Sequence, residues 1–272
     1  MRSDDEILEL SARYRNEGRP FAIATVVRSR DTTSAKAGAK AMITADGVMV
    51  GWIGGGCALN ATRSAASRAM SDGRARLIRV RPTEGEAGGE GFEEVESHCP
   101  SRGTLDIFVE PMLPAPVLVI MGTSPVGQAL AVLAKRIGFA VTAAVREGEA
   151  PLYEEADAVV EGLDVATQNG DSERYVVVAT QGRGDREALA AALEAGATYV
   201  AFVASRRKAA KLKEDLAAAG HDRARVDAIR APAGLDIGAV TPEEIAVSIL
   251  AEIVAVHREA TGPGSAEAGD AP

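Results

Sequence analysis

The sequence predicts an α/β protein in which an N-terminal α+β domain precedes a Rossmann-like, doubly wound domain with a parallel sheet. In the first half, short apolar strands alternate with polar loops and one alanine-rich helix. In the second half, Val117–Met121 is a continuous apolar run, as in parallel strands covered on both faces, and a glycine turn and a helix follow it directly. Prolines punctuate the join, so we expect domains at 1–112 and 113–260 and a disordered tail at 261–272.

The first domain is expected to open with an amphipathic helix over Asp5–Glu17. A second, alanine- and arginine-rich helix is predicted over Ala58–Ser71. The glycine-rich, acidic stretch Glu84–Glu96 predicts a flexible loop. The apolar, β-branched runs that predict strands are Phe21–Val27, Met42–Thr44, Val48–Ile53, Leu77–Val80 and Thr104–Glu110.

The second domain alternates strands and helices. Strands are predicted over Val117–Met121, Phe139–Val145, Ala158–Val160, Tyr175–Thr180 and Tyr199–Ala204. Helices are predicted over Gln128–Ile137, Arg186–Glu194 and Arg206–Ala219. The last helix begins at Thr241-Pro242-Glu243-Glu244, where the threonine is an N-cap, the proline occupies N1 and the glutamate at N3 completes a capping box.

Composition limits the class of protein. The chain has 272 residues, 46% of them hydrophobic and 25% charged, which is typical of a soluble globular protein. Its net charge of −9 disfavours nucleic acids and anionic membranes as partners, because phosphates would be repelled. The two cysteines, Cys57 and Cys99, are too few for a disulfide framework or a four-ligand zinc site. With neither a signal peptide nor an apolar span, we expect a cytoplasmic protein with reduced thiols.

The run Gly54-Gly55-Gly56-Cys57 is the most unusual stretch of the first domain. Consecutive glycines cost backbone entropy but let a ligand approach the main chain closely. The run leads into the predicted helix, and free amides at a helix start favour anions and lower the pKa of a cysteine placed there. A tight strand-to-helix turn with a buried cysteine explains the same residues, so the local sequence leaves both interpretations open.

The second domain carries an incomplete nucleotide fingerprint. Gly122 and Gly127 take the first and third places of G-x-G-x-x-G, but Ser124 replaces the middle glycine that normally approaches a pyrophosphate. The second strand ends at Arg146 instead of the acidic residue that binds a ribose diol, so Arg146 is a candidate for a phosphate contact. The pattern supports the fold more strongly than it supports a nicotinamide dehydrogenase.

These motifs resemble the XdhC/CoxI family, whose members are accessory proteins of molybdenum-cofactor enzymes of the xanthine dehydrogenase and aerobic CO dehydrogenase type. The resemblance extends over nearly the whole chain. The blocks that carry it are Ala24–Val27, Gly38–Lys40, Gly54–Cys57, Gly103–Pro111, Gly122–Gly127, Ser205–Lys208, Ala231–Gly238 and Thr241–Glu244. The chain departs from the family pattern at Leu59, where an acidic residue is common, and at Ser124.

The resemblance implies a cofactor-binding chaperone and not a turnover enzyme. Such a protein binds the molybdenum cofactor, as molybdopterin or its cytosine dinucleotide, protects it during sulfuration and delivers it to an apo molybdenum hydroxylase. A cysteine desulfurase is an implied second partner, and we expect a homodimer. Cys57 would contact molybdenum through the bound cofactor. The residues we assign to cofactor binding are Lys40, Gly54, Gly55, Gly56, Cys57, Cys99, Gly122, Ser124, Gly127, Arg146, Ser205, Arg206, Arg207 and Asp236.

Two other functions remain open from the residues alone. The first is an NAD(P)-dependent oxidoreductase that uses Cys57 or Cys99, which the Rossmann-like half favours and Ser124 disfavours. The second is a scaffold that docks to its client enzyme, in which the glycine run is only a turn. No catalytic residues are assigned, because no proton-transfer pair accompanies the nucleotide-type fold.

Overall fold

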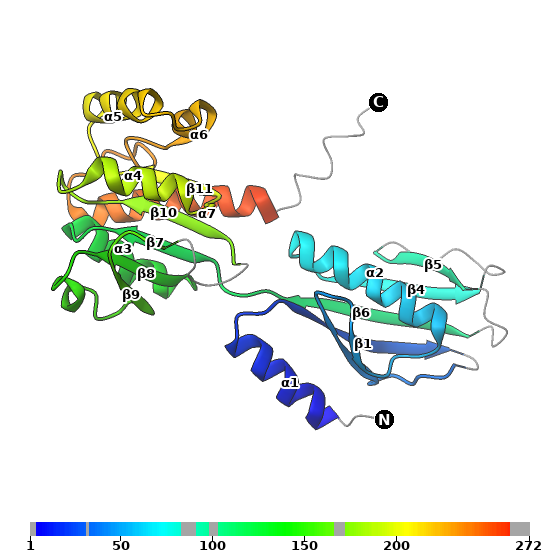
Figure 1. Cartoon of the computed structure of the whole chain (residues 1–272). Coiled ribbons are helices and arrows are strands. Elements are labelled where there is room, and N and C mark those ends of the chain that lie inside the picture. The colour runs from blue at the N-terminus through cyan, green and yellow to red at the C-terminus, as the bar shows by residue number, and fades with distance from the viewer. Residues whose placement is uncertain (1–3, 31–32, 83–90, 98–102, 166–171, 262–272) are drawn as a thin grey trace, which may run out of the picture. The chain divides into compact units, whose positions relative to one another are not determined.

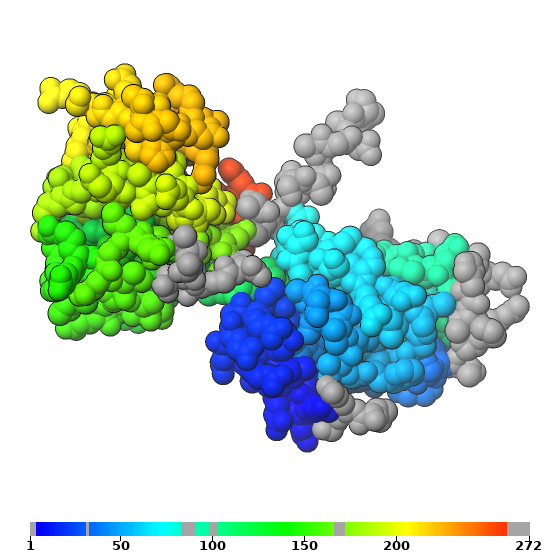
Figure 2. Space-filling view, viewed as in Figure 1, coloured from blue at the N-terminus to red at the C-terminus, as the bar shows by residue number. Residues whose placement is uncertain are grey.

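The computed structural model describes residues 4–30, 33–82, 91–97, 103–165 and 172–261. The chain divides into two compact units, Met1–Pro114 and Ala115–Ala260. Each unit has one β-sheet with helices packed on it (Figure 1) and its own hydrophobic core. Figure 2 shows the surface in the same view. The predicted fold class, an α+β region followed by a Rossmann-like parallel-sheet domain, is confirmed.

The first unit is built on a six-stranded sheet with the strand order β3-β2-β1-β6-β4-β5. Helix α2 packs on one face and α1 covers part of the other (Figure 1). Neighbouring strands are antiparallel except β4 and β5, which are parallel. The elements are α1 Asp4–Asn16, β1 Phe21–Arg30, β2 Lys40–Thr44, β3 Met49–Gly51, α2 Gly56–Asp72, β4 Arg76–Pro82, β5 Glu93–Ser97 and β6 Thr104–Met112.

Small side chains allow α2 to lie close to the sheet. The buried side of the helix is formed mainly by alanines, which lose little side-chain entropy on packing. These alanines are Ala58, Ala61, Ala65, Ala66 and Ala69. They pack against apolar residues of β1, β4 and β6 in a single cluster. This packing fixes the first turn of α2, and with it the end of the glycine run, against the sheet.

Strand β5 corrects the prediction of a loop over Glu84–Glu96. Residues 83–90 lie outside the described residues, but Glu93–Ser97 forms a strand parallel to β4. Arginines hold its acidic side chains: Arg76 Nη1 donates to Glu93 Oε1 at 2.6 Å, and Arg81 Nη2 donates to Glu94 Oε2 at 2.8 Å. Two of the acidic residues that suggested a loop, Glu93 and Glu94, are therefore paired within the sheet.

The second unit contains a five-stranded, all-parallel sheet with the order β11-β10-β7-β8-β9. Helices α3 and α7 cover one face, and α4, α5 and α6 cover the other (Figure 1). The chain reverses its winding direction between β7 and β10, which makes their carboxyl ends the topological switch point. The elements are β7 Val117–Met121, α3 Pro125–Arg136, β8 Ala140–Val145, β9 Ala158–Glu161, β10 Arg174–Val178, α4 Asp185–Glu194, β11 Tyr199–Phe202, α5 Arg206–Ala218, α6 Arg223–Ala228 and α7 Pro242–Thr261.

The capping box that starts α7 is confirmed. The Thr241 amide donates to Glu244 Oε2 at 3.0 Å, and the Glu244 amide donates to Thr241 Oγ1 at 3.2 Å. The short helix α6 was not predicted, since its six residues carry little periodic signal. Of the predicted tail at 261–272, only Thr261 belongs to the described residues, and it is the last residue of α7.

Candidate functional site

Gly55 and Cys57 begin helix α2 and line a small cavity in the first unit. Gly55 is the N-cap, and having no side chain it gives the helix no side-chain cap. Amides of a first helical turn lack intrahelical partners, and the helix dipole adds partial positive charge there. The cavity holds about 40 Å³, and its lining residues are Thr33, Ser34, Gly55, Cys57, Ala58, Val80, Ser97, Gly103 and Leu105. A half-buried free thiol and an uncapped helix start therefore share one site.

The three glycines before Cys57 differ in what the fold requires of them. Gly54 has φ +128°, and a Cβ there would lie 3.1 Å from Leu105 Cδ1, so the fold favours glycine. Gly55 has φ −74°, and a Cβ there would meet only the Ser34 hydroxyl, at 3.9 Å. A Cβ on Gly56 would meet nothing within 4 Å. The fold explains Gly54, and glycine is a favoured N-cap residue at Gly55. Gly56 is the glycine that the fold leaves unexplained.

Two neighbouring features complete this region. Trp52 Nε1 donates to the backbone carbonyl of Ser34 at 3.4 Å, which ties the loop after β1 to the glycine run. Ser97 and Gly103 line the cavity. Cys99, which the sequence also assigns to the cofactor, lies outside the described residues, so its assignment stays a prediction.

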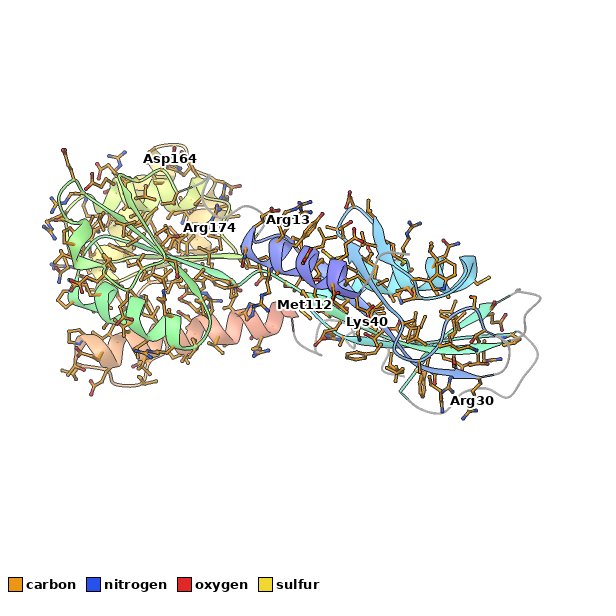
Figure 3. All side chains as sticks on the ribbon, turned by 90° about the horizontal axis from the view of Figure 1, so that it is seen from below. Arg13, Arg30, Lys40, Met112, Asp164 and Arg174 are labelled. Carbon is orange, nitrogen blue, oxygen red and sulfur yellow. The ribbon has the colours of Figure 1, made fainter. Side chains whose placement is uncertain are left out.

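Lys40 does not lie with Cys57. Successive residues of a strand face opposite sides of the sheet; in β2, Ala41 packs under α2 whereas Met42 packs on the α1 side. Lys40 shares the side of Met42, and its Nζ donates to Thr25 Oγ1 at 3.2 Å (Figure 3). The sheet therefore separates the Lys40 side chain from the Cys57 cavity.

The turn Gly122–Gly127 uses much of its hydrogen-bonding capacity internally. The Gly122 and Ser124 amides donate to backbone carbonyls at the ends of β8 and β10, at 2.9 and 3.3 Å. The Gly127 amide donates to the Ser124 hydroxyl at 3.1 Å, and Pro125 at N1 has no N–H. These amides are not free to hold a pyrophosphate, which weakens the dinucleotide interpretation beyond the loss of the middle glycine.

Gly122 and Gly127 are both required by close packing. A Cβ on Gly122, where φ is +100°, would lie 2.7 Å from Thr180 Cα. A Cβ on Gly127 would lie 2.6 Å from the Tyr153 hydroxyl, which itself donates to the Gly122 carbonyl at 2.7 Å. Both glycines therefore have a structural explanation that needs no ligand.

A second cavity, of about 130 Å³, opens at the topological switch point and is named here the switch-point cavity. Its lining residues are Gly122, Thr123, Ala144, Val145, Arg146, Glu149, Gly162, Leu163, Thr180, Arg183 and Gly184. Gly122 and Arg146 are the members that the sequence assigns to the cofactor. Arg183 and Glu149 were not predicted. The only sequence signals for them are their positions just after β10 and β8, where switch-point ligands bind.

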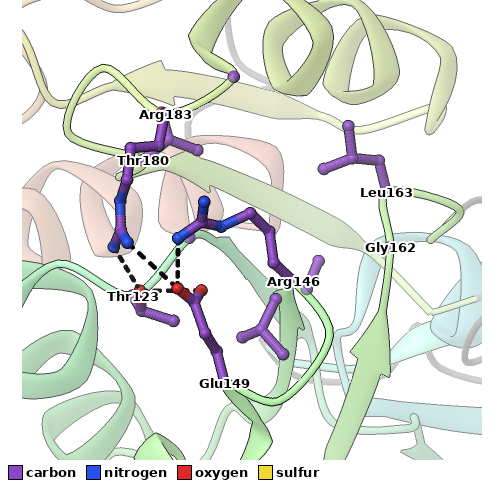
Figure 4. Close-up of a pocket in the computed structure, with 11 residues that line it drawn as sticks. Thr123, Arg146, Glu149, Gly162, Leu163, Thr180 and Arg183 are labelled. Carbon is purple, nitrogen blue, oxygen red and sulfur yellow. Dashed lines mark hydrogen bonds and ion pairs between the residues drawn. The ribbon is translucent and has the colours of Figure 1, made fainter.

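Glu149 is the centre of a charged cluster at this cavity (Figure 4). Its Oε1 pairs with Arg146 and lies 3.2 Å from Arg183 Nη1. Thr123 Oγ1 donates to Glu149 Oε2 at 3.2 Å and accepts from Arg183 Nη2 at 3.0 Å. The hydrogen bond from Arg146, helped by Thr123 and the charge of Arg183, holds the pKa of Glu149 below its usual value. One carboxylate is thus clamped between two cations.

A buried carboxylate anchors the loop that presents Arg183. Asp185 accepts from the Thr180 hydroxyl and from the Gly182 amide, the latter at 2.9 Å, and forms an ion pair with Lys208. Burial opposes the ionisation of Asp185, but these partners outweigh it and lower its pKa. In the same loop Gln181 has φ +52°, a conformation uncommon outside glycine. The loop is therefore held in a fixed, locally strained conformation.

A third cavity, of about 530 Å³, lies at the carboxyl end of β11, and two of the four remaining assigned residues line it. Ser205 is the N-cap of α5, and its hydroxyl accepts from the Lys208 amide at 3.4 Å. Arg206 and Asp236 both line the cavity, and their charged groups lie 3.9 Å apart. Both side chains are largely exposed, so this pair contributes little to stability. Arg207 is exposed on the first turn of α5.

The described residues include neither a metal-binding group of side chains nor a membrane-spanning helix. Within them, no group of three or more His, Cys, Asp or Glu side chains is placed to bind a metal ion. The helices found there also include none that is long and apolar enough to span a bilayer.

Known proteins resemble this chain in both units. The sequence model of the XdhC Rossmann domain matches residues 118–253, half of the chain, and that of the XdhC and CoxI family matches residues 14–81. Uncharacterized protein YqeB of Escherichia coli (strain K12) is 33% identical over 264 residues, which cover 93% of this chain and 46% of YqeB. The chain thus spans about half the length of that relative.

A solved structure gives a weaker likeness. A chain from Bacillus halodurans whose structure is described as a xanthine dehydrogenase is 19% identical, with 95% of this chain and 96% of that chain covered and a TM-score of 0.46. The family matches and the identity with YqeB decide the assignment. This chain belongs to the XdhC and CoxI family.

Proposed function

We propose that this chain is a maturation factor that binds the molybdenum cofactor, supports its sulfuration and delivers it to an apo molybdenum hydroxylase. The cofactor would be molybdopterin or its cytosine dinucleotide, and the sulfur would come from a cysteine desulfurase. Membership of the XdhC and CoxI family supports the coarser part, a role in the maturation of enzymes of the xanthine dehydrogenase type.

The observation that carries the finer part is Gly56, the first residue of α2. Glycine costs up to about 1 kcal/mol relative to alanine in a helix, yet a Cβ on Gly56 would meet nothing within 4 Å. Close approach of a ligand to the backbone explains why this side chain is missing. The amides of the uncapped α2 start, directly before Cys57, suit an anionic group of such a ligand.

The size of the cavity favours a hold-and-release role. At about 40 Å³ it is far smaller than the roughly 150 Å³ that encloses a single six-membered ring. Only one end of the cofactor would enter, with Cys57 facing the metal or its sulfur and the rest lying open for transfer. A single thiol is a weak anchor for a metal compared with the three or four ligands of resident sites.

Substituting Cys57 should remove cofactor retention without unfolding the chain. We expect Cys57→Ala, purified from a cofactor-producing host, to carry at least about tenfold less bound pterin than the unaltered protein, since the cofactor loses the thiol at the start of α2. Bound pterin and cytosine nucleotide would be quantified after release and oxidation. Cys99→Ala, measured in parallel, assigns the loss to one cysteine or the other.

Gly56→Ala separates binding from folding. The added methyl group has space, so the free energy of unfolding should stay the same or rise by about 0.5 kcal/mol. Pterin retention and activation of the apo-hydroxylase should both fall, because the methyl group stands where the ligand meets the backbone. Full activation by Cys57→Ala and Gly56→Ala together would instead identify a docking scaffold and refute the proposed cofactor site.

A further inference from the structure

The switch-point cavity has the size and lining of a site for one ring. Its volume of about 130 Å³ is close to that of cavities that hold a single six-membered ring. Ala144, Val145 and Leu163 give it an apolar side, and Gly162 leaves its rim open. At the switch point of a parallel sheet, this is where the nucleoside part of a nucleotide is normally bound.

The mouth of the same cavity carries an excess of positive charge. Arg146 and Arg183 share the single carboxylate of Glu149, which leaves the cluster with a net charge of +1. Each guanidinium has five N–H donors, and the bonds to Glu149 and Thr123 use only one or two of them. The remaining donors suit a group with several anionic oxygens, of which a phosphate monoester is the best match.

The cationic groups are also held in place before any ligand arrives. The loop that carries Arg183 is fixed through Asp185, which binds Thr180, the Gly182 amide and Lys208. An ordered binding loop loses little conformational entropy on association. In the turn before α3, in contrast, the Gly122, Ser124 and Gly127 amides are already bonded within the protein.

We propose that the switch-point cavity binds a nucleoside phosphate, with the nucleoside ring in the cavity and the phosphate monoester between Arg146 and Arg183. In the free protein the Glu149 carboxylate occupies the phosphate position as an internal anion, and the ligand displaces it. The ligand is a mononucleotide or one mononucleotide half of a larger cofactor. The residues of this site and those around Cys57 lie in different units, so the two sites can be tested separately.

The test is calorimetric titration of the full chain with cytidine 5′-monophosphate, adenosine 5′-monophosphate, adenosine and inorganic phosphate. We expect saturable binding of a mononucleotide, and binding at least about tenfold weaker for adenosine and for phosphate alone, since each lacks half of the contacts. Comparison of the two nucleotides reports the preferred base. Raising the ionic strength should weaken the interaction, because the phosphate contacts lie at a partly exposed mouth.

Two substitutions are expected to act in opposite directions. Glu149→Gln removes the internal anion and should tighten nucleotide binding about tenfold, whereas Arg183→Gln should weaken it about tenfold. Arg223→Gln is the matched control, because Arg223 is also paired with a carboxylate but lies exposed on α6. It should leave the affinity unchanged.

Three outcomes would overturn the proposal. One is no saturable binding to the Glu149→Gln protein; another is weaker binding by that variant, which would make Glu149 a ligand-binding acceptor and not a displaced anion. The third is a lower melting temperature in both variants with unchanged affinity, which would identify a structural clamp. Full pterin retention in Cys57→Ala with nucleotide binding intact would refute the site at Cys57 alone, so the two proposals fail separately.

Discussion

Gly122→Ala is expected to destabilise the second unit by about 2–5 kcal/mol. Gly122 has φ +100°, which costs a residue with a side chain about 1–2 kcal/mol. The new Cβ would also lie 2.7 Å from Thr180 Cα and 2.8 Å from the Ala179 carbonyl oxygen. Both are backbone atoms, so β7 and β10 would have to separate where they adjoin the switch-point cavity, at a further cost of about 1–3 kcal/mol.

Gly138→Ala is the matched control for this prediction. Gly138 has φ +93°, but a Cβ there would meet nothing within 4 Å. Only the cost of the left-handed backbone conformation, about 1–2 kcal/mol, therefore applies. The difference between the two variants therefore isolates the contact between β7 and β10. A Gly122→Ala protein no less stable than Gly138→Ala would show that this contact is loose.

The two units allow an internal check. The single tryptophan, Trp52, lies in the first unit, so its fluorescence follows that unit during urea unfolding, while circular dichroism follows both. Gly122→Ala should move the unfolding transition of the second unit to lower urea concentration. Circular dichroism detects that transition, whereas Trp52 fluorescence does not. An equal shift in Trp52 fluorescence would mean that the units unfold as one.

Much of the fold could be predicted because its signals are local. The apolar run Val117–Met121 indicates a strand buried on both faces, and Thr241 with Glu244 marks the start of α7 by adjacent hydrogen bonds. Strand β5 was missed for the opposite reason. Glu93 and Glu94 look like loop residues until arginines of β4, more than ten positions away in the chain, neutralise them.

The candidate sites were predicted only where neighbours in the chain form them. Gly55 and Cys57 adjoin in sequence, so their shared place at the start of α2 followed from local reasoning. The side of the sheet on which Lys40 lies depends on strand register, which the sequence leaves undetermined. Glu149 and Arg183 meet only because loops after different strands converge at the switch point.

Asp106→Asn should destabilise the first unit by about 3 kcal/mol at neutral pH. The Asp106 side chain is 3% exposed on β6 and accepts from Arg79 Nε at 2.7 Å and from Arg28 Nε at 2.5 Å. Removing one partner of a buried ion pair costs about 3–5 kcal/mol, because the remaining charges lose compensation. We take the lower end, since Arg28 is partly exposed. Glu17→Gln, which breaks the exposed pair with Arg19 in the same unit, is the control and should cost less than about 1 kcal/mol.

The pH dependence of the free energy of unfolding identifies why Asp106→Asn is less stable than the unaltered chain. Burial opposes ionisation of Asp106, but Arg79 and Arg28 outweigh it, so the folded-state pKa lies below the unfolded value of about 3.9. A lowered carboxyl pKa stabilises the fold fully above the unfolded pKa, and this contribution is lost as the pH falls through the folded one. We therefore expect the full difference in the free energy of unfolding between Asp106→Asn and the unaltered chain at pH 7, and a difference that disappears as the pH falls below about 4. Urea unfolding followed by Trp52 fluorescence measures it. A difference in the free energy of unfolding that stays constant down to the acid limit would assign the loss to packing. The other carboxyl groups are common to both proteins, so Asp106 is the titrating group by which they differ.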